Sequence, residues 1–321
     1  MEREIMVSID CLTFNHENYI ADAIESFLAQ KTDFDFEILI YDDASTDRTQ
    51  EIIREYEKKH PNLIKPIYQK ENQYSKGIKV ELINDDRGSG KYIAVCEGDD
   101  YWTDPLKLQK QVNYMEAHPE CSMCVHAAHK VSSTKKKKLS KVRPSQESRV
   151  FTVEEIIEGG GEFVATNSIM FSREKVIAMP DFYMNAVVGD YPLIIHGALK
   201  GTVYYIDEFM SAYRIGVDGS WTERELATLD KKVKHVNDIG SMLDEINEYT
   251  NFKYNQAISR TKKKNYLCLL LELGKNQEAK KTEYKELYRE LGLKRRTTLK
   301  VKHLFPRMTR VLKAVKWKLI T

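Results

Sequence analysis

Residues 1–131 alternate short apolar runs with stretches of helical periodicity, and this alternation limits the fold more than any other feature. Apolar residues recur at helical spacing within 20–28, and Thr49–His60 is a second helical pattern behind the cap candidates Ser45 and Thr46. Four runs have the length and the Val, Ile and Tyr content of strands: Ile5–Leu12, Phe36–Tyr41, Ile64–Tyr68 and Tyr92–Cys96. Strands that alternate with helices predict a parallel, doubly wound α/β sheet.

The α/β pattern continues to about residue 222. Asp104-Pro105 predicts the start of a helix that His118-Pro119 ends, and the polar stretch 132–149 predicts a solvated loop. Apolar runs and caps predict the other elements: a capping-box helix from Thr152, a strand at Ser168–Phe171, a helix from Asp190, and strands at Val203–Ile206 and Met210–Arg214. From about residue 223 the pattern is helical only.

Charge separates an acidic body from a basic tail. After Glu290 the chain has ten Lys and Arg residues and no Asp or Glu; the other 40 basic residues stand against 48 acidic ones, a net charge of about −8. We expect an α/β domain over 1–222, a helical extension over 223–293 and a basic amphipathic tail over 294–321. The tail pattern is typical of a helix on an anionic membrane surface, with a solvated helix docked on its own domain as the alternative. The acidic body argues against nucleic acid as a partner.

Composition and the N-terminal residues indicate the compartment. No run approaches the ~20 apolar residues of a membrane span, and the first residues lack a leader pattern. We therefore expect a cytoplasmic protein, peripheral on the inner face of the plasma membrane. The five cysteines are an odd number at irregular spacing, so free thiols are expected.

Polar side chains gather where three of the predicted strands end: Thr13-Phe14-Asn15, Asp42 to Asp47, and Glu97 to Trp102. Open α/β sheets bind ligands at the carboxyl ends of their strands. Each segment alone can be explained by a purely structural role as a turn or a helix cap. Adjacent carboxylates, however, repel each other and are best tolerated when a divalent cation lies between them and a polyphosphate. The three segments together favour a nucleoside-diphosphate substrate with Mg²⁺ or Mn²⁺.

In these motifs the chain resembles the family-2 glycosyltransferases of the GT-A fold, which are inverting enzymes of bacterial polysaccharide assembly. The resemblance covers about residues 5–222 and includes three further motifs in the expected order: Gly90 to Ala94, Gly189 to Leu193, and Tyr213-Arg214. It implies a Rossmann-like nucleotide-diphospho-sugar transferase sheet followed by the helical extension. The implied reaction moves a sugar from a nucleotide-diphosphate donor to a glycan or lipid-linked acceptor.

The resemblance also implies roles for the residues at the strand ends. Thr13, Phe14 and Asn15 line the pocket for base and ribose, and Asp42 belongs to the same nucleotide site. Asp43 accepts a hydrogen bond from the base, which makes uracil the favoured base because it carries an imide N–H.

A second group of implied roles concerns metal and catalysis. Asp99 and Asp100 hold the metal, with Asp99 also beside the nucleotide, and Glu97 stands where the family has Asp. We expect that removing Asp100 leaves the fold intact. Asp190 falls at the position of the catalytic base, with a helix cap as the alternative. Trp221 is assigned to the acceptor side, with a packed core aromatic as the alternative. Gly216 stands where the family often has His.

Two other functions are open to an α/β chain of this kind. A sugar-nucleotide pyrophosphorylase would share the sheet and the metal-bound phosphates, but it usually has a Gly-rich, basic loop after the first strand. Leu12–Glu17 contains no Gly, Arg or Lys. A non-catalytic membrane scaffold would have no use for the acidic strand ends.

Three local patterns mimic other sites. Gly88 to Lys91 resembles a phosphate loop, but a strand follows it instead of a helix. Cys121, Cys124, His126 and His129 resemble a zinc site, yet in a strand Cys121 and Cys124 point to opposite faces. Cys124 with His126 has no third group to orient it as a nucleophile pair. We therefore expect a packed strand over these residues.

Overall fold

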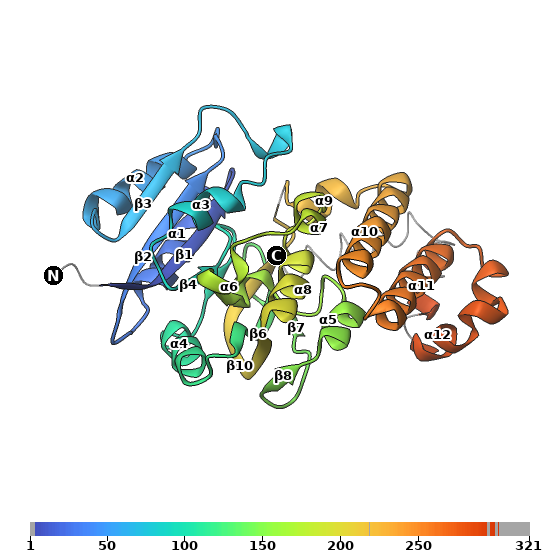
Figure 1. Ribbon diagram of the computed structural model, residues 1–321. Coiled ribbons are helices and arrows are strands. Elements are labelled where there is room, and N and C mark those ends of the chain that lie inside the picture. Colours follow the sequence, from blue (N-terminus) through green and yellow to red (C-terminus); the bar gives the residue numbers. More distant parts are fainter. Residues whose placement is uncertain (1–3, 218, 294–295, 299–300, 302–321) are drawn as a thin grey trace. The chain divides into compact units, whose positions relative to one another are not determined.

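The computed structural model describes residues 4–217, 219–293, 296–298 and 301 (Figure 1). The predicted basic tail, 294–321, lies outside the described residues except at four positions. The chain divides into two compact units. The sheet unit holds the residues up to 131 together with 138–180 and 193–215, and the helical unit holds 132–137, 181–192 and the residues from 216 onward.

A mixed sheet of ten strands forms the sheet unit, in the order β3-β2-β1-β4-β9-β6-β10-β5, with β7 beside β6 and β8 beside β10. β1 to β4 run parallel, which confirms the four predicted N-terminal strands. The complete sheet is mixed, because β9 lies antiparallel between β4 and β6. The strands are β1 (Ile5–Thr13), β2 (Asp35–Asp42), β3 (Ile64–Tyr68), β4 (Tyr92–Val95), β5 (Tyr101–Trp102), β6 (Cys121–Ser132), β7 (Lys138–Val142), β8 (Arg149–Phe151), β9 (Met170–Ser172) and β10 (Thr202–Ile215).

Helices α1 and α4 of the sheet unit bury apolar side chains against these strands. Helix α1 buries Ile20, Ile24 and Phe27, and α4 buries Leu108 and Met115, all within one cluster that also holds apolar residues of β1, β2 and β4. The strands that lead to the polar strand ends are therefore anchored in this core. The helices are α1 (Ile20–Leu28), α2 (Thr49–Lys59), α3 (Glu81–Arg87), α4 (Lys107–Ala117), α5 (Val153–Gly159) and α6 (Arg173–Val176).

Several predicted boundaries move. The capping box of α5 is confirmed, but neither Ser45 nor Thr46 caps α2: the helix begins at Thr49 directly after Arg48, and Asp47 Oδ1 accepts from Thr49 N at 3.0 Å. Helix α4 begins only at Lys107, because Asp104 turns the chain by accepting from Leu106 N at 2.8 Å. The predicted loop 132–149 contains strand β7, which pairs with β6 as a hairpin.

The last strand of the sheet is also longer than predicted. The two strands expected at 203–206 and 210–214 are one continuous strand, β10.

The helical unit consists of α7 (Asp181–Met184), the first turn of α8 (Asp190–Lys200), α9 (Trp221–Glu225), α10 (Leu229–Tyr249), α11 (Asn255–Glu272) and α12 (Lys285–Glu290). Helices α10 and α11 are joined by the ion pair between Lys232 and Glu272, at 2.6 Å. A second apolar cluster connects α11 with α12 through Leu267, Leu271 and Leu287. No described helix combines the length and apolar character needed to span a membrane.

Candidate functional site

The turns after β1 and β2 are bonded to each other. Asn15 has a left-handed backbone (φ 56°), a conformation that Asn tolerates better than most residues. Its N–H donates to Ser45 Oγ at 2.9 Å, and its Oδ1 accepts from Thr46 N at 2.8 Å. The chain also closes between the strand ends, where Asp43 N donates to the Thr13 carbonyl at 3.0 Å. The two segments predicted to bind a nucleotide therefore form one continuous surface.

Asp42 and Asp43 both hold backbone in place. Buried Asp42 accepts from Ser45 N at 3.0 Å and from Gln50 Nε2 at 2.6 Å. Asp43 accepts from Gln73 N at 2.7 Å and from Tyr74 N at 3.0 Å, one bond for each carboxylate oxygen. An ionised carboxylate offers roughly four acceptor positions, so Asp43 retains capacity for a base N–H.

The carboxylates of Glu97, Asp99 and Asp100 converge after β4. Their ligand oxygens lie within 4.8 Å of one another, and no other group of this kind occurs among the described residues. Gly98 lets this acidic segment approach the end of β1, because a Cβ there would lie 2.7 Å from Thr13 Oγ1. Gly98 N also donates to the Leu12 carbonyl at 2.8 Å. The structure thus brings together the first and third of the polar strand ends.

Asp100 is the most enclosed member of the acidic segment. Its Oδ1 accepts from Arg214 N at 2.7 Å, and its Oδ2 accepts from Asn167 Nδ2 at 2.9 Å. Burial, followed by the charges of Asp99 and Glu97, raises its pKa well above the usual value. Asp100 therefore joins the segment to β10 as well as contributing charge, and removing it would leave two buried donors unsatisfied.

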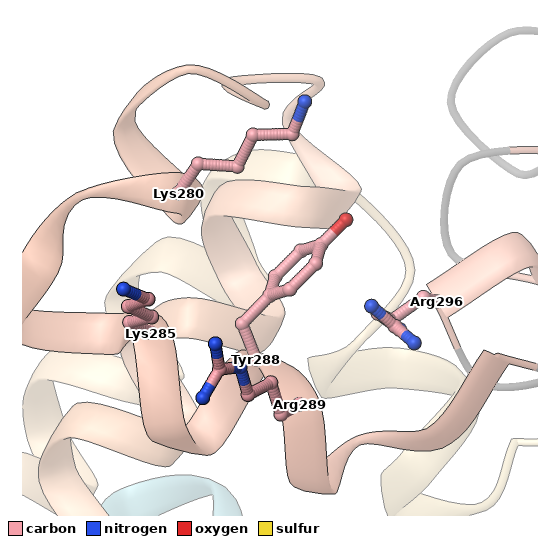
Figure 2. A pocket seen from close by; sticks show the side chains of 5 residues that line it. All are labelled: Lys280, Lys285, Tyr288, Arg289 and Arg296. Carbon is pink, nitrogen blue, oxygen red and sulfur yellow. The ribbon is translucent and has the colours of Figure 1, made fainter.

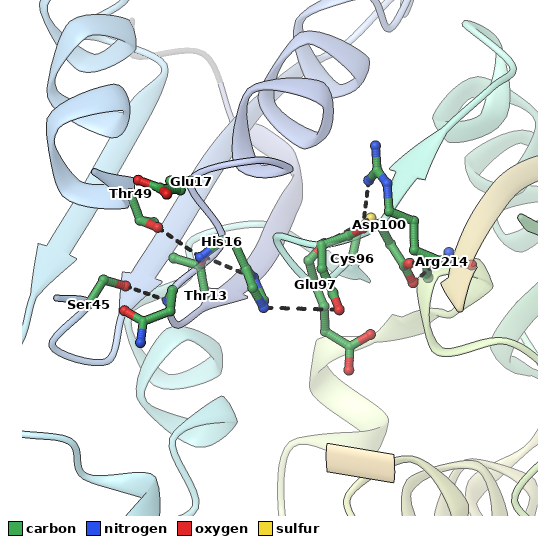
Figure 3. A network of polar contacts seen from close by, with 12 residues as sticks. Thr13, His16, Glu17, Ser45, Thr49, Cys96, Glu97, Asp100 and Arg214 are labelled. Atoms are coloured by element: carbon green, nitrogen blue, oxygen red, sulfur yellow. Dashed lines mark hydrogen bonds and ion pairs between the residues drawn. The ribbon is translucent and has the colours of Figure 1, made fainter. Parts of the chain in front are cut away.

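Arg214 supplies the positive charge next to the acidic segment (Figure 3). Its side chain is fully buried; Nη1 donates to the Asp99 carbonyl at 2.6 Å, and Nη2 pairs with Asp22 of α1. The guanidinium lies 5.1 Å from the Tyr19 ring centroid and 4.6 Å from that of Tyr101. Sequence analysis had noted the Tyr213-Arg214 pair as a motif, but it had assigned no role to Arg214.

His16 is a site residue that sequence analysis missed. Its Nδ1 lies 3.1 Å from Thr13 Oγ1, and its Nε2 lies 4.0 Å from Asp99 Oδ2. Figure 3 shows the ring directed from the turn after β1 toward the acidic segment. The available signal was its position directly after Thr13-Phe14-Asn15. Gly216 stands where the family often has His. Its left-handed backbone (φ 78°) disfavours any residue with a side chain.

Asp190 and Trp221 belong to the helical unit, whereas the acidic segment belongs to the sheet unit. Asp190 is the first residue of α8, and its Oδ1 accepts from Tyr191 N at 2.7 Å. Trp221 is the first residue of α9, and its ring meets His235 edge to face at 5.4 Å. Both positions fit a structural role.

The patterns that mimic other sites have structural explanations. Ser89 N and Gly90 N donate to Glu37 Oε1 at 2.7 Å and Ser8 Oγ at 2.9 Å, so these loop amides already have partners. The stretch from Cys121 to His129 lies in β6, which confirms the predicted strand.

The donor set suits a hard divalent cation. Glu97, Asp99 and Asp100 offer only oxygen ligands, which Mg²⁺ and Mn²⁺ prefer over softer metals. Three carboxylates this close repel one another, and the nearby cation, Arg214, already pairs with Asp22. A bound divalent ion would offset the remaining negative charge.

The model of the family described as glycosyl transferase family 2 matches residues 8–177. The chain is a family-2 glycosyltransferase. An uncharacterized protein of Mycobacterium tuberculosis is 36% identical over 215 residues, which are 67% of this chain and 60% of that relative. The aligned part thus spans less than two thirds of the relative. The Escherichia coli UDP-Glc:alpha-D-GlcNAc-diphosphoundecaprenol beta-1,3-glucosyltransferase WfaP is 33% identical over 111 residues, 35% of this chain and 41% of WfaP.

Solved structures share the GT-A fold of this family-2 member. S. aureus TarS 1-349 in complex with UDP-GlcNAc has a TM-score of 0.54 and 15% identity, covering 93% of this chain and 91% of TarS 1-349. The mannosyltransferase PcManGT of Pyrobaculum calidifontis, in complex with GDP-Man and Mn²⁺, has a TM-score of 0.58 and 13% identity, covering 95% and 89%. The predicted fold class is therefore confirmed.

Proposed function

We propose that this chain is an inverting, metal-dependent glycosyltransferase that moves a sugar from a nucleotide-diphosphate donor, a UDP-sugar, to a hydroxyl group. The observation that carries the proposal is the convergence of Glu97, Asp99 and Asp100 beside the joined ends of β1 and β2. Family membership supports the reaction class.

The donor nucleotide is assigned to the surface formed by the turns after β1 and β2. Thr13, Phe14 and Asn15 would contact base and ribose, and Asp43 would accept from the imide N–H of uracil. Asp42 would hold the second turn, as its bonds to Ser45 and Gln50 indicate. The neighbour TarS binds a uridine nucleotide sugar, which supports UDP as the carrier.

The metal site is assigned to the acidic segment. Asp99 and Asp100 would hold Mg²⁺ or Mn²⁺ on the donor diphosphate, and Glu97 would join them because its carboxylate lies in the same cluster. The ion, when bound, neutralises charge on the leaving diphosphate. The neighbour PcManGT contains Mn²⁺ with its sugar nucleotide, which supports this assignment.

Asp190 is assigned as the base. Inversion requires the acceptor hydroxyl to attack the anomeric carbon from the face opposite the diphosphate, while a carboxylate removes its proton. The position of Asp190 within the motif Gly189 to Leu193 supports this role.

The acceptor is proposed to be a glycan or lipid-linked saccharide of cell-surface polysaccharide synthesis. WfaP, by its name, glucosylates a lipid-linked GlcNAc. Trp221 is proposed to contact the acceptor, because a half-buried indole offers an apolar face to a sugar ring. The basic tail would hold the protein on an anionic membrane.

The test is thermal stabilisation by UDP with and without Mn²⁺, followed by a screen of sugar nucleotides for hydrolysis without acceptor. We expect UDP to raise the Tm only when Mn²⁺ is present, and one or a few UDP-sugars to be hydrolysed. Formation of a UDP-sugar from UTP and a sugar 1-phosphate would instead identify a pyrophosphorylase. No nucleotide binding at all would support a non-catalytic scaffold.

A further inference from the structure

Helix α12 and the segments on either side of it form a hollow with strong positive charge. A cavity of about 280 Å³ is lined by Lys280, Lys285, Tyr288, Arg289 and Arg296, here called the basic pocket. Figure 2 shows Tyr288 at its centre with the four cationic side chains around it. No carboxylate lines the cavity.

The local sequence explains why these side chains meet. Lys285, Tyr288 and Arg289 lie at helical spacing on one face of α12, and Lys280 ends the short turn Glu278–Lys280 before it. Beyond α12, Gly292 adopts a left-handed backbone (φ 63°) that ends the helix. The Arg296 guanidinium lies 4.8 Å from the Tyr288 ring centroid.

Packing contacts fix the position of the aromatic ring in the basic pocket. Tyr288 packs against the apolar cluster of the helical unit, which contains Leu267, Leu271 and Leu287. The Arg296 side chain is also held in place, because its Nε donates to the Gly292 carbonyl at 3.3 Å. The central ring and the guanidinium above it are thus positioned by contacts that involve no ligand.

Three cations of the pocket lack counter-charges in the part of the chain that the structure describes. Lys280, Lys285 and Arg289 form no ion pair with any described residue, although acidic side chains are close in sequence. Glu290 instead accepts two bonds from Arg260, at 2.7 and 2.6 Å, and Glu278 lies 3.8 Å from Lys275. Like charges four residues apart on a helix, as in Lys285 and Arg289, are unfavourable. An anion in the pocket would remove this repulsion.

We propose that the basic pocket binds a phosphate or diphosphate group, in addition to the donor diphosphate at the acidic segment. Arg289 and Arg296 offer planar pairs of donors, the two lysines offer point charges, and the Tyr288 hydroxyl offers a further donor. The inference deepens the proposed function, on which it rests for its biological meaning: a lipid-linked acceptor carries such a group. A soluble phosphate compound has the same chemistry.

The experiment is calorimetric titration of the full chain with inorganic pyrophosphate and, separately, with farnesyl diphosphate. Both are run in EDTA, which removes the metal that the donor site needs. The test variant is Lys285→Gln/Arg289→Gln. The matched control is Lys234→Gln/Lys262→Gln, because these two lysines belong to the same unit, pair with Asp238 and Asp244, and change the net charge equally. Thermal melts establish that all variants fold.

We expect the wild type and the control to bind, and the test variant to bind at least tenfold more weakly, since each lost charge-assisted bond costs about that factor. Tighter binding of farnesyl diphosphate would indicate the lipid-linked source, and equal binding the soluble one. Equal weakening in both variants would show only general electrostatics and overturn the proposal. So would binding to anionic vesicles without binding of either diphosphate.

The outcome is separable from that of the proposed function. Sugar-nucleotide hydrolysis without acceptor depends on the acidic segment, so the test variant is expected to retain it. A wild type that binds pyrophosphate in EDTA but hydrolyses no sugar nucleotide would contradict the proposed function and leave the pocket assignment standing.

Discussion

At the scale of single residues, Asp190 combines a structural contact with a proposed chemical role. Its carboxylate accepts a hydrogen bond from the Tyr191 amide in the first turn of α8, and an asparagine side chain can make the same bond. Proton abstraction requires the carboxylate itself. One substitution therefore separates the two roles.

Asp190→Asn is expected to leave thermal stability and UDP binding unchanged while transfer falls by roughly 10²–10⁴-fold, the usual contribution of a general base. The measurement is kcat with saturating donor and acceptor, beside a Tm. Near-normal transfer by a folded variant would leave Asp190 as a helix cap only.

The acidic segment offers a second test at this scale, in which Asp99 and Asp100 are expected to behave differently. Asp99→Asn removes one ligand charge without a buried bond to lose, so metal-dependent UDP binding should weaken by about tenfold or more at unchanged stability. Asp100→Asn should also lower the free energy of unfolding by about 1–3 kcal/mol, because an amide cannot accept both existing hydrogen bonds. Calorimetry with UDP–Mn²⁺ and urea unfolding measure the two effects; UDP–Mn²⁺ binding by Asp99→Asn at wild-type affinity would refute the metal assignment.

At the scale of elements, Arg214 connects three of them. It joins β10 to the segment after β4 through the Asp99 carbonyl and to α1 through Asp22. Burying the Arg214 guanidinium costs little free energy only while all of these partners are in place. The site therefore depends on the packing of α1 as well as on the strand ends.

Arg214→Gln is expected to lower the free energy of unfolding by about 3 kcal/mol, because it removes the buried charge that pairs with Asp22 and the donor to the Asp99 carbonyl. UDP–Mn²⁺ binding should weaken along with it. Arg143→Gln, which breaks a bidentate pair with Asp207 on the surface, is the control and should change stability by less than about 1 kcal/mol. Urea titrations compare the two; similar small losses would show that Arg214 does not anchor the segment.

At the scale of the whole molecule, buried charge links stability to pH. Asp10 and Asp85 are both buried, and Asp10 Oδ1 accepts from buried Asn84 at 2.6 Å. Burial raises the pKa of Asp10 from 3.8 to about 7, and that of Asp85 well above its usual value. Between about pH 4 and 7 these two carboxyl groups thus hold more protons in the folded chain than in the unfolded chain, so their contribution to stability falls as pH rises through this window.

Asp10→Asn stays neutral and keeps an acceptor for Asn84, so it should flatten part of this pH dependence. Relative to the wild type, we expect the free energy of unfolding to be higher by about 3 kcal/mol at pH 8 and almost unchanged at pH 4. Urea unfolding at several pH values measures it, with the exposed Asp33→Asn as control. A variant whose pH profile parallels that of the wild type would contradict the assignment.

Membrane attachment is also a property of the whole molecule. Ending the chain after Val301 removes six Lys and Arg residues of the tail but keeps Arg296. We expect this truncation to release the protein from anionic vesicles, and high salt to release the full chain in part, because salt screens charge attraction. Co-sedimentation measures the bound fraction, with zwitterionic vesicles as control. Unchanged binding after truncation would place the membrane contact elsewhere.

The amino-acid sequence determined the features that depend on neighbours along the chain. Apolar periodicity located β1 to β4, α1 and α2, and the polar residues directly after three strands indicated the candidate site. The predictions of helices and strands succeed because each of these elements is formed by residues that are contiguous in sequence. The capping box at Thr152 and Glu155 succeeded for the same reason.

Only the tertiary structure decided which distant segments meet. The antiparallel entry of β9 brings Asn167 to Asp100, and β10 brings Arg214 to Asp22, 192 positions away in the chain. Likewise, His16 acquires its place beside Asp99 only because Gly98 lets two strand ends touch. Periodicity carries no record of such contacts, since pairing order and close approach are set by packing of the whole sheet.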